Sequence, residues 1–146
     1  MARFKFRLQG YRDLKGKLED QAKLEYGVSL VKLERENAKK TSLETEREAN
    51  ILRFKEEARS TIRPSEFKMM GLYIERLKQE IAAQAVKVSK AEAEAQEKRL
   101  ALVEAMKQRK MLDKLYEKAR DSHYAEEAKA EQSIVDEVIS YRLSKL

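Results

Sequence analysis

The sequence predicts an all-α protein, folded as a long antiparallel two-helix coiled coil, and three observations carry this prediction. Charged residues make up 40% of the 146-residue chain and aromatic residues only 7%, a composition typical of long helices. Helix breakers are few, with one proline and four glycines. None of them falls in residues 72–146, so the sequence offers one obvious place to turn.

The clearest periodicity lies in the second half of the chain, where seam residues recur alternately three and four positions apart. The seam runs through Phe67, Met70, Ile74, Leu77, Ile81, Gln84, Val88, Ala91, Ala95, Lys98, Leu102, Ala105, Arg109, Leu112, Tyr116 and Ala119. Most of these are apolar, which predicts a stripe that winds slowly around a partner helix. The exceptions, Gln84, Lys98 and Arg109, are expected to cost stability but to fix the register.

The first half of the chain is also predicted to be helical, although its apolar residues are spaced less regularly. Its expected seam runs through Tyr11, Leu14, Leu18, Leu24, Val28, Val31, Leu33, Leu43, Ile51, Phe54 and Ala58. A polar stretch from Glu34 to Thr41 interrupts this seam and predicts a solvated, weakly held part of the helix.

The predicted turn surrounds the single proline, Pro64, which cannot continue a helix from the residues before it. We expect helix 1 at about 6–58, a loop at about 59–65 and helix 2 at about 66–142, within one domain of residues 1–146. Ser65 is the expected N-cap. Because a short loop makes the helices antiparallel neighbours, residue i should face about 125 − i. The seam stops at Ala119, close to where helix 1 should run out, so the chain after about residue 120 should overhang.

The net charge of +6 is unevenly distributed along the chain. Basic residues dominate 1–16 and 98–120, which antiparallel pairing would place side by side as a basic collar. In residues 121–137 the charged side chains are acidic except for Lys129. An acidic extension beside a basic face argues against nucleic-acid binding and fits the end of a helical hairpin that enters a protein socket. Ordinary solvated helix faces are the alternative.

The sequence contains no pattern typical of catalysis or of metal and cofactor binding. It has no cysteine, no glycine-rich phosphate loop and a single histidine, His123, and two helices enclose no deep pocket. We therefore expect no enzyme, no cofactor and no metal. The start of the chain is not typical of a secretory signal, and no apolar stretch of about 20 residues predicts a membrane span.

Several segments resemble the flagellar export protein family FliJ. They are FKFRLQ at 4–9, GLYIERLK at 71–78, RKMLDKLY at 109–116 and EQSIVDE at 131–137. The resemblance implies an antiparallel coiled coil similar to the central stalk of rotary ATPases. It also implies three partners: the hexameric flagellar export ATPase, the export gate membrane protein FlhA, and export chaperones. The implied location is cytoplasmic and peripheral at the inner membrane.

The resemblance also implies two sets of contact residues. The expected contacts with the ATPase ring are Phe4, Phe6, Arg7, Leu8, Asp136, Glu137 and Arg142, with the two phenylalanines as exposed anchors. The expected contacts with the export gate are Tyr73 and Leu77. Leu77 lies on the seam, so core packing is an equal alternative for it, whereas Tyr73 should be exposed. Other functions left open are a general coiled-coil scaffold or chaperone, a basic nucleic-acid-binding protein, and a homodimer in place of the hairpin.

Overall fold

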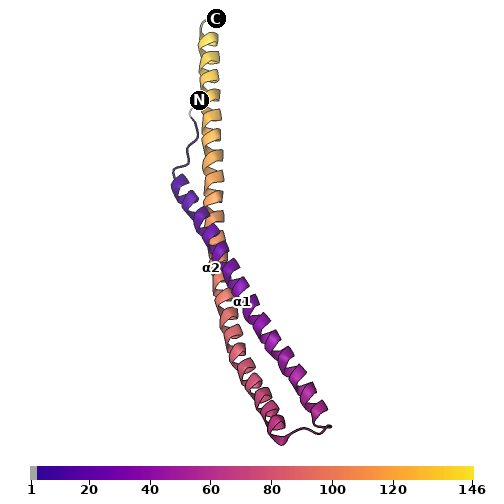
Figure 1. Ribbon diagram of the computed structural model, residues 1–146. Helices are drawn as coiled ribbons and strands as arrows, with labels where there is room; N and C mark the ends of the chain where they lie inside the picture. Colours follow the sequence, from indigo (N-terminus) through magenta and orange to yellow (C-terminus); the bar gives the residue numbers. More distant parts are fainter. Residues whose placement is uncertain (1–2) are drawn as a thin grey trace. The chain divides into compact units, whose positions relative to one another are not determined.

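The computed structural model describes residues 3–146 and contains two α-helices, α1 (Gln9–Glu57) and α2 (Pro64–Ser144), with no strand among the described residues. The helices pack against each other in antiparallel directions (Figure 1), so the predicted all-α helical hairpin is confirmed. The chain divides into two compact units. One joins the chain up to Gln21 with Val103–Leu146, and the other is Ala22–Leu102.

The turn between the helices begins where α1 tightens its last hydrogen bonds. The amides of Arg59 and Ser60 donate to carbonyls three residues back, at 3.2 and 3.1 Å, and the Ser60 hydroxyl donates to the Glu57 carbonyl. This 3₁₀-type ending satisfies the terminal carbonyls without a glycine. The predicted N-cap at Ser65 is wrong, because α2 already begins at Pro64. Proline suits the first helical position, where no amide hydrogen is required.

The seam predicted for α2 is confirmed along its whole length. Every predicted seam position from Phe67 to Ala119 is buried or half-buried. The most buried are Leu77 and Ala91, each with 2% of its surface exposed. Because successive seam residues stay on the side that faces α1, the regular spacing of apolar residues positions this helix.

The seam predicted for the start of α1 is wrong. Leu24 and Val28 are each 64% exposed, and the other members of the expected seam up to Val31 are exposed as well. The covered positions instead follow a different heptad stripe: Arg12, Lys15, Glu19, Ala22, Tyr26, Ser29, Leu33, Glu36, Lys40, Leu43, Arg47, Asn50, Phe54 and Glu57. Most of these side chains are polar or charged, so α1 turns much of its apolar surface away from α2.

The polar residues of the α2 seam explain this orientation, because each has a glutamate partner on α1. Gln84 donates to the backbone carbonyl of Glu36 at 2.9 Å and to its carboxylate at 2.5 Å. The Lys98 ammonium lies 3.4 Å from the Glu25 carboxylate. Arg109 donates to Glu19, which is only 3% exposed. A buried polar group without a partner costs free energy, so these pairs favour the rotation of α1 that brings its glutamates toward α2.

The predicted pairing, in which residue i faces about 125 − i, holds where the chain up to Gln21 meets α2. Arg12 and Asp113 satisfy it and form an ion pair at 2.9 Å. Near the loop the pairing shifts by about a turn. Phe54 stacks on Phe67, four residues before its predicted partner Gly71, with 4.2 Å between ring centroids, although the edge of the same ring still lies beside Gly71. The reason is that the loop lies at 58–63, so the chain reverses earlier than expected.

Candidate protein-binding surfaces

The first segment of the described chain, residues 3–8, precedes α1 and packs on α2 through its aromatic side chains. The Phe4 ring lies 5.6 Å from the Tyr116 ring and 5.3 Å from the His123 ring, and Phe6 lies 5.4 Å from Tyr116. Edge-to-face contacts of this kind are favourable. The expectation that Phe4 and Phe6 are freely exposed anchors is wrong, because both are half-buried.

The order of side chains in this segment explains the contact. Exposure alternates from Arg3 to Arg7, with Phe4 and Phe6 covered and the three basic residues exposed. In a non-helical, extended backbone, residues two apart point to the same side, whereas in a helix they would diverge. Both rings can therefore reach Tyr116 only because α1 starts at Gln9 rather than at residue 6. The alternation of aromatic and basic residues was the sequence signal for this arrangement.

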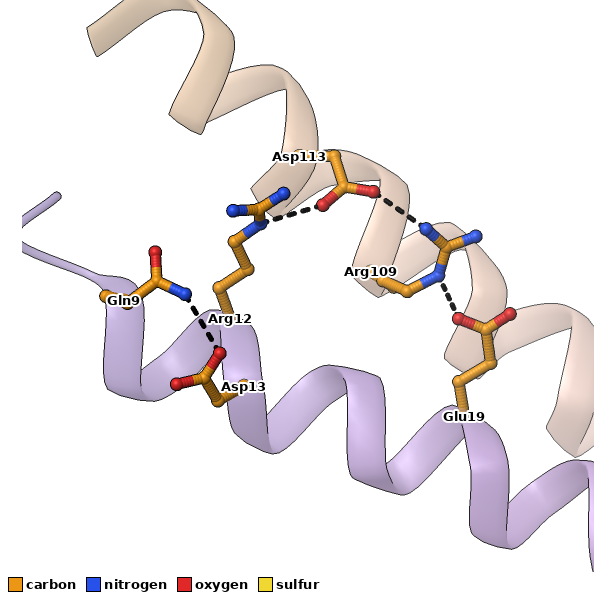
Figure 2. Close-up of polar contacts among 6 residues, drawn as sticks. All are labelled: Gln9, Arg12, Asp13, Glu19, Arg109 and Asp113. Carbon is orange, nitrogen blue, oxygen red and sulfur yellow. Dashed lines mark hydrogen bonds and ion pairs between the residues drawn. The ribbon is translucent and has the colours of Figure 1, made fainter. Parts of the chain in front are cut away.

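A chain of alternating charges continues the contact between α1 and α2 in this unit (Figure 2). Asp113 accepts hydrogen bonds from Arg12 at 2.9 Å and from Arg109 at 2.7 Å, and Arg109 also donates to Glu19. The hydrogen bond with Glu19 and the charge of its carboxylate raise the pKa of Arg109 above its ordinary value, with a smaller contribution from Asp113. Because the guanidinium stays charged at any physiological pH, these four residues hold α1 against α2 across that range; we call them the charge cluster.

The charge cluster also changes the expected basic collar, because several basic side chains of the collar already pair with residues of α2. Arg12 is paired with Asp113 and stacks over the Tyr116 ring at 4.1 Å, and Lys15 donates to Gln108 at 2.7 Å. Within residues 103–120, the exposed Lys107, Lys110, Lys114 and Lys118 lie on the outer surface of α2. Part of the positive charge thus holds the two helices together, and part faces outward.

The C-terminal part of α2 is uncovered. All residues from 128 to 146 are exposed. Asp136, Glu137 and Arg142 therefore lie on an open helix surface, where Asp136 accepts a hydrogen bond from Gln132 at 3.0 Å. Exposed apolar residues lie on the same segment: Ile134, Val135, Val138, Ile139, Tyr141 and Leu143. An uncovered segment with this many apolar side chains is typical of a binding element.

The structure groups the expected ring-contact residues only in part. Phe4 and Phe6 meet at Tyr116, while Arg7 and Leu8 are exposed next to them. Asp136, Glu137 and Arg142 follow along α2, beginning about 20 Å of helix beyond His123. The expected residues thus form one cluster and one separate exposed segment.

The two expected gate-contact residues differ in accessibility. Leu77 is 2% exposed and packs in the core. Tyr73 is 41% exposed, and its hydroxyl donates to the Glu46 carboxylate on α1. This hydrogen bond is the main reason that the pKa of Tyr73 is raised above 10.0, because the carboxylate stabilises the protonated phenol.

Two apolar residues beside Tyr73 were missed in the sequence. Met69 and Leu72 are both exposed, and residues three and four apart lie on the same helix face. Their signal in the sequence was that both are apolar residues that lie off the predicted seam, Met69 one position and Leu72 two positions from Met70. Together with Tyr73 they form an exposed apolar patch near the start of α2.

An antiparallel pair of helices with a largely apolar seam and exposed apolar segments defines a coiled-coil protein. Among residues 3–146, no group of side chains is placed to hold a metal ion. The sequence profile of the flagellar FliJ protein family matches residues 4–145. The chain belongs to the FliJ family and is a component associated with flagellar protein export. No match is found among curated proteins or among solved structures.

Neither helix contains a stretch apolar enough to cross a lipid bilayer, within the residues that the structure describes.

Proposed function

We propose that the chain is a stalk-like cytoplasmic component of the flagellar export apparatus that inserts its N- and C-terminal end into the hexameric export ATPase ring. The observation that carries this proposal is the uncovered part of α2 from residue 128 onward, in a chain of the FliJ family. Its exposed apolar residues are typical of a surface that a partner covers, and the carboxylates of Asp136 and Glu137 lie among them. A ring interior would supply one.

A single asymmetric chain in a ring of six subunits contacts those subunits unequally. Unequal contacts change nucleotide affinity differently from one subunit to the next, which is the requirement for coupling between sites. The exposed Arg7 and Leu8, beside the Phe4–Phe6–Tyr116 cluster, provide a second contact surface. Through both, the chain promotes ring assembly and ATPase activity.

The experiment compares ATPase activity and ring assembly with the unaltered chain and with its variants. Val138→Glu together with Tyr141→Glu should weaken stimulation at least about tenfold, a loss of about 1.4 kcal/mol. Leu52→Glu is the matched control, because Leu52 is 61% exposed, against 60% for Tyr141 and 46% for Val138, but lies near the loop. If the double variant stimulated the ATPase as well as the control did, insertion of this segment would be ruled out.

We propose that the export gate protein FlhA binds the apolar patch of Met69, Leu72 and Tyr73. Leu77 supports this patch from the core rather than contacting the gate, since almost none of its surface is exposed. In a binding assay with the cytoplasmic part of the gate protein, Leu72→Glu should abolish binding while Leu52→Glu preserves it. Equal binding by the two variants would contradict the assignment.

We further propose that residues 1–146 act as one coiled-coil domain, because α1 and α2 each run without a break through both compact units. Escort of export chaperones belongs to the same proposal and rests on the family alone. A single unfolding transition seen by different probes would support one domain. Two separate transitions would contradict it.

A further inference from the structure

A groove runs along α1 on residues that neither the ring contact nor the gate contact uses. It has a volume of about 860 Å³ and is lined by Lys23, Leu24, Gly27, Val28, Val31, Lys32, Arg35, Glu36 and Lys39. Leu24, Gly27, Val28 and Val31 follow the i, i+3, i+4, i+7 spacing of one helix face. The groove is therefore an apolar stripe on the surface of α1.

The side of α1 that carries the groove is turned away from α2. Ser29, on the covered side, is 4% exposed, while Leu24 and Val28 keep most of their surface in contact with solvent. Packing within the described chain therefore leaves the stripe without a partner. Isolated exposed apolar residues are ordinary, but a continuous apolar stripe is typical of a binding surface.

Gly27 is one of the residues that line the groove. A methyl group placed at its Cβ position would meet no atom within 4 Å, so packing within the chain does not require a glycine. Glycine also weakens a helix interior, since it loses the most backbone freedom on folding. Its effect here is to leave space into which another helix can approach closely.

The charges around the groove select the partner. Its rim carries four basic side chains, Lys23, Lys32, Arg35 and Lys39, and one acidic side chain, Glu36. Lys32 also lies 3.0 Å from the Glu94 carboxylate of α2, and Lys39 lies 3.9 Å from the Glu36 carboxylate, which accepts a hydrogen bond from Gln84. Exposed ion pairs of this kind are weak, and the four cations outnumber the two carboxylates, so the rim keeps a net positive charge. A partner that buries the apolar stripe brings its own flanking residues next to these cations, and carboxylates there would be complementary.

We propose that the groove between Lys23 and Lys39 binds an amphipathic helix of a partner protein, with an apolar stripe flanked by aspartate and glutamate residues. A helix suits the groove because its length, about 24 Å along α1, corresponds to four to five helical turns. The mode is a helix that lays apolar residues spaced i, i+3, i+4 and i+7 into a groove. The proposal goes beyond the ring and gate contacts and does not depend on them.

The first test measures binding of two designed peptides to the full chain by fluorescence anisotropy. Both are amphipathic helices with a leucine stripe, flanked by glutamates in one peptide and by lysines in the other. We expect the glutamate peptide to bind at least tenfold more tightly than the lysine peptide, with an affinity that falls as salt rises. Equal affinities, or no binding of the glutamate peptide, would overturn the proposal.

The second test locates the binding site with matched variants. Leu24→Glu combined with Val28→Glu should reduce binding of the glutamate peptide at least tenfold, and Leu52→Glu should leave it unchanged. Gly27→Gln should also weaken binding, because it fills the groove. It should not lower the melting temperature, because its Cβ meets open space and glutamine is the better helix former. Gly10→Gln, which also meets open space, is its control. Unchanged binding by Gly27→Gln would rule out the groove.

The third test asks whether a second copy of this chain occupies the groove instead. Sedimentation of the unaltered chain should show a monomer over the concentrations used for peptide binding. If the chain instead associates with itself, and Leu24→Glu with Val28→Glu abolishes that association, the occupant is another copy and the proposed partner is wrong.

Discussion

In α2 the face that meets α1 carries Leu77, Val88 and Leu112, whereas the opposing face of α1 carries Glu19 and Glu36 among few apolar residues. The two helices therefore contribute differently to the hairpin. The α2 seam supplies apolar burial, and α1 supplies partners for the polar residues of that seam. A two-helix protein can thus be held together by one regular apolar stripe, provided that the facing helix satisfies its polar interruptions.

This division of roles leaves α1 with apolar residues on its outer face. On α2 up to Ala119, the regularly spaced apolar residues face inward. On α1, Leu24, Val28 and Val31 face outward. Exposed apolar residues bring no stability to the hairpin, so the outer face of α1 is available for another role. The following predictions test this contrast, in order of decreasing effect.

The largest effect is expected for Leu77→Ala, in the core of the α2 seam. Removing a fully buried leucine side chain should cost about 2–5 kcal/mol of unfolding free energy, because it leaves a cavity. Leu52→Ala, on the exposed side of α1, should change that free energy by less than about 0.5 kcal/mol. Urea denaturation followed by circular dichroism measures both. Similar losses for the two variants would contradict the contrast between the faces.

Glu19→Ala should cost about 1–3 kcal/mol, because it removes the buried carboxylate to which Arg109 donates and leaves Asp113 as the carboxylate partner of that guanidinium. Glu25→Ala should cost less than about 1 kcal/mol, since its ion pair with Lys98 is more exposed. A double-mutant cycle between Glu19 and Arg109 measures the coupling directly. If the cycle showed no coupling, the inward rotation of α1 would need another cause.

Phe4→Ala should release the segment before α1 from Tyr116 at a cost of about 1–2 kcal/mol. The near-ultraviolet circular dichroism of the tyrosines should weaken, and backbone amides near Gln9 should exchange faster with solvent. Lys5→Ala, at an exposed position between the two phenylalanines, is the control and should change neither signal. A signal from Tyr116 that survives in the Phe4 variant would show that this segment does not pack as described.

The smallest effect is expected in the titration of Tyr73. Glu46→Gln should lower the pKa of Tyr73 toward 10.0, because it removes the carboxylate that raises this pKa. A raised pKa in the folded state means that the contact stabilises the fold fully below the unfolded pKa and is lost as pH rises through the folded pKa. The difference in phenolate absorbance between the unaltered chain and Tyr73→Phe isolates this titration. An unchanged midpoint in Glu46→Gln would exclude the hydrogen bond as its cause.

The candidate surfaces were predictable from the sequence to different extents. Tyr73 was expected to be exposed because it lies off the seam, and it is. Phe4 and Phe6 were expected to be exposed as well, but their alternation with basic residues lets both reach Tyr116. The wrong expectation for Phe4 and Phe6 arose from extending helix 1 to residue 6. The ends of helices depend on contacts beyond their own sequence.

The sequence alone determined the two helices, the position of the turn and the inner face of α2, because a heptad of apolar residues permits only one buried side. It did not determine the inner face of α1 up to Val31, where an apolar stripe and a polar stripe compete, although the later seam members Leu33, Leu43, Ile51 and Phe54 are half-buried as predicted. Only the tertiary structure decided between them. The polar stripe faces inward because Glu19 and Glu36 meet Arg109 and Gln84 there, while the exposed Glu25 reaches Lys98 from the edge of that stripe. Those pairings join residues far apart in the sequence.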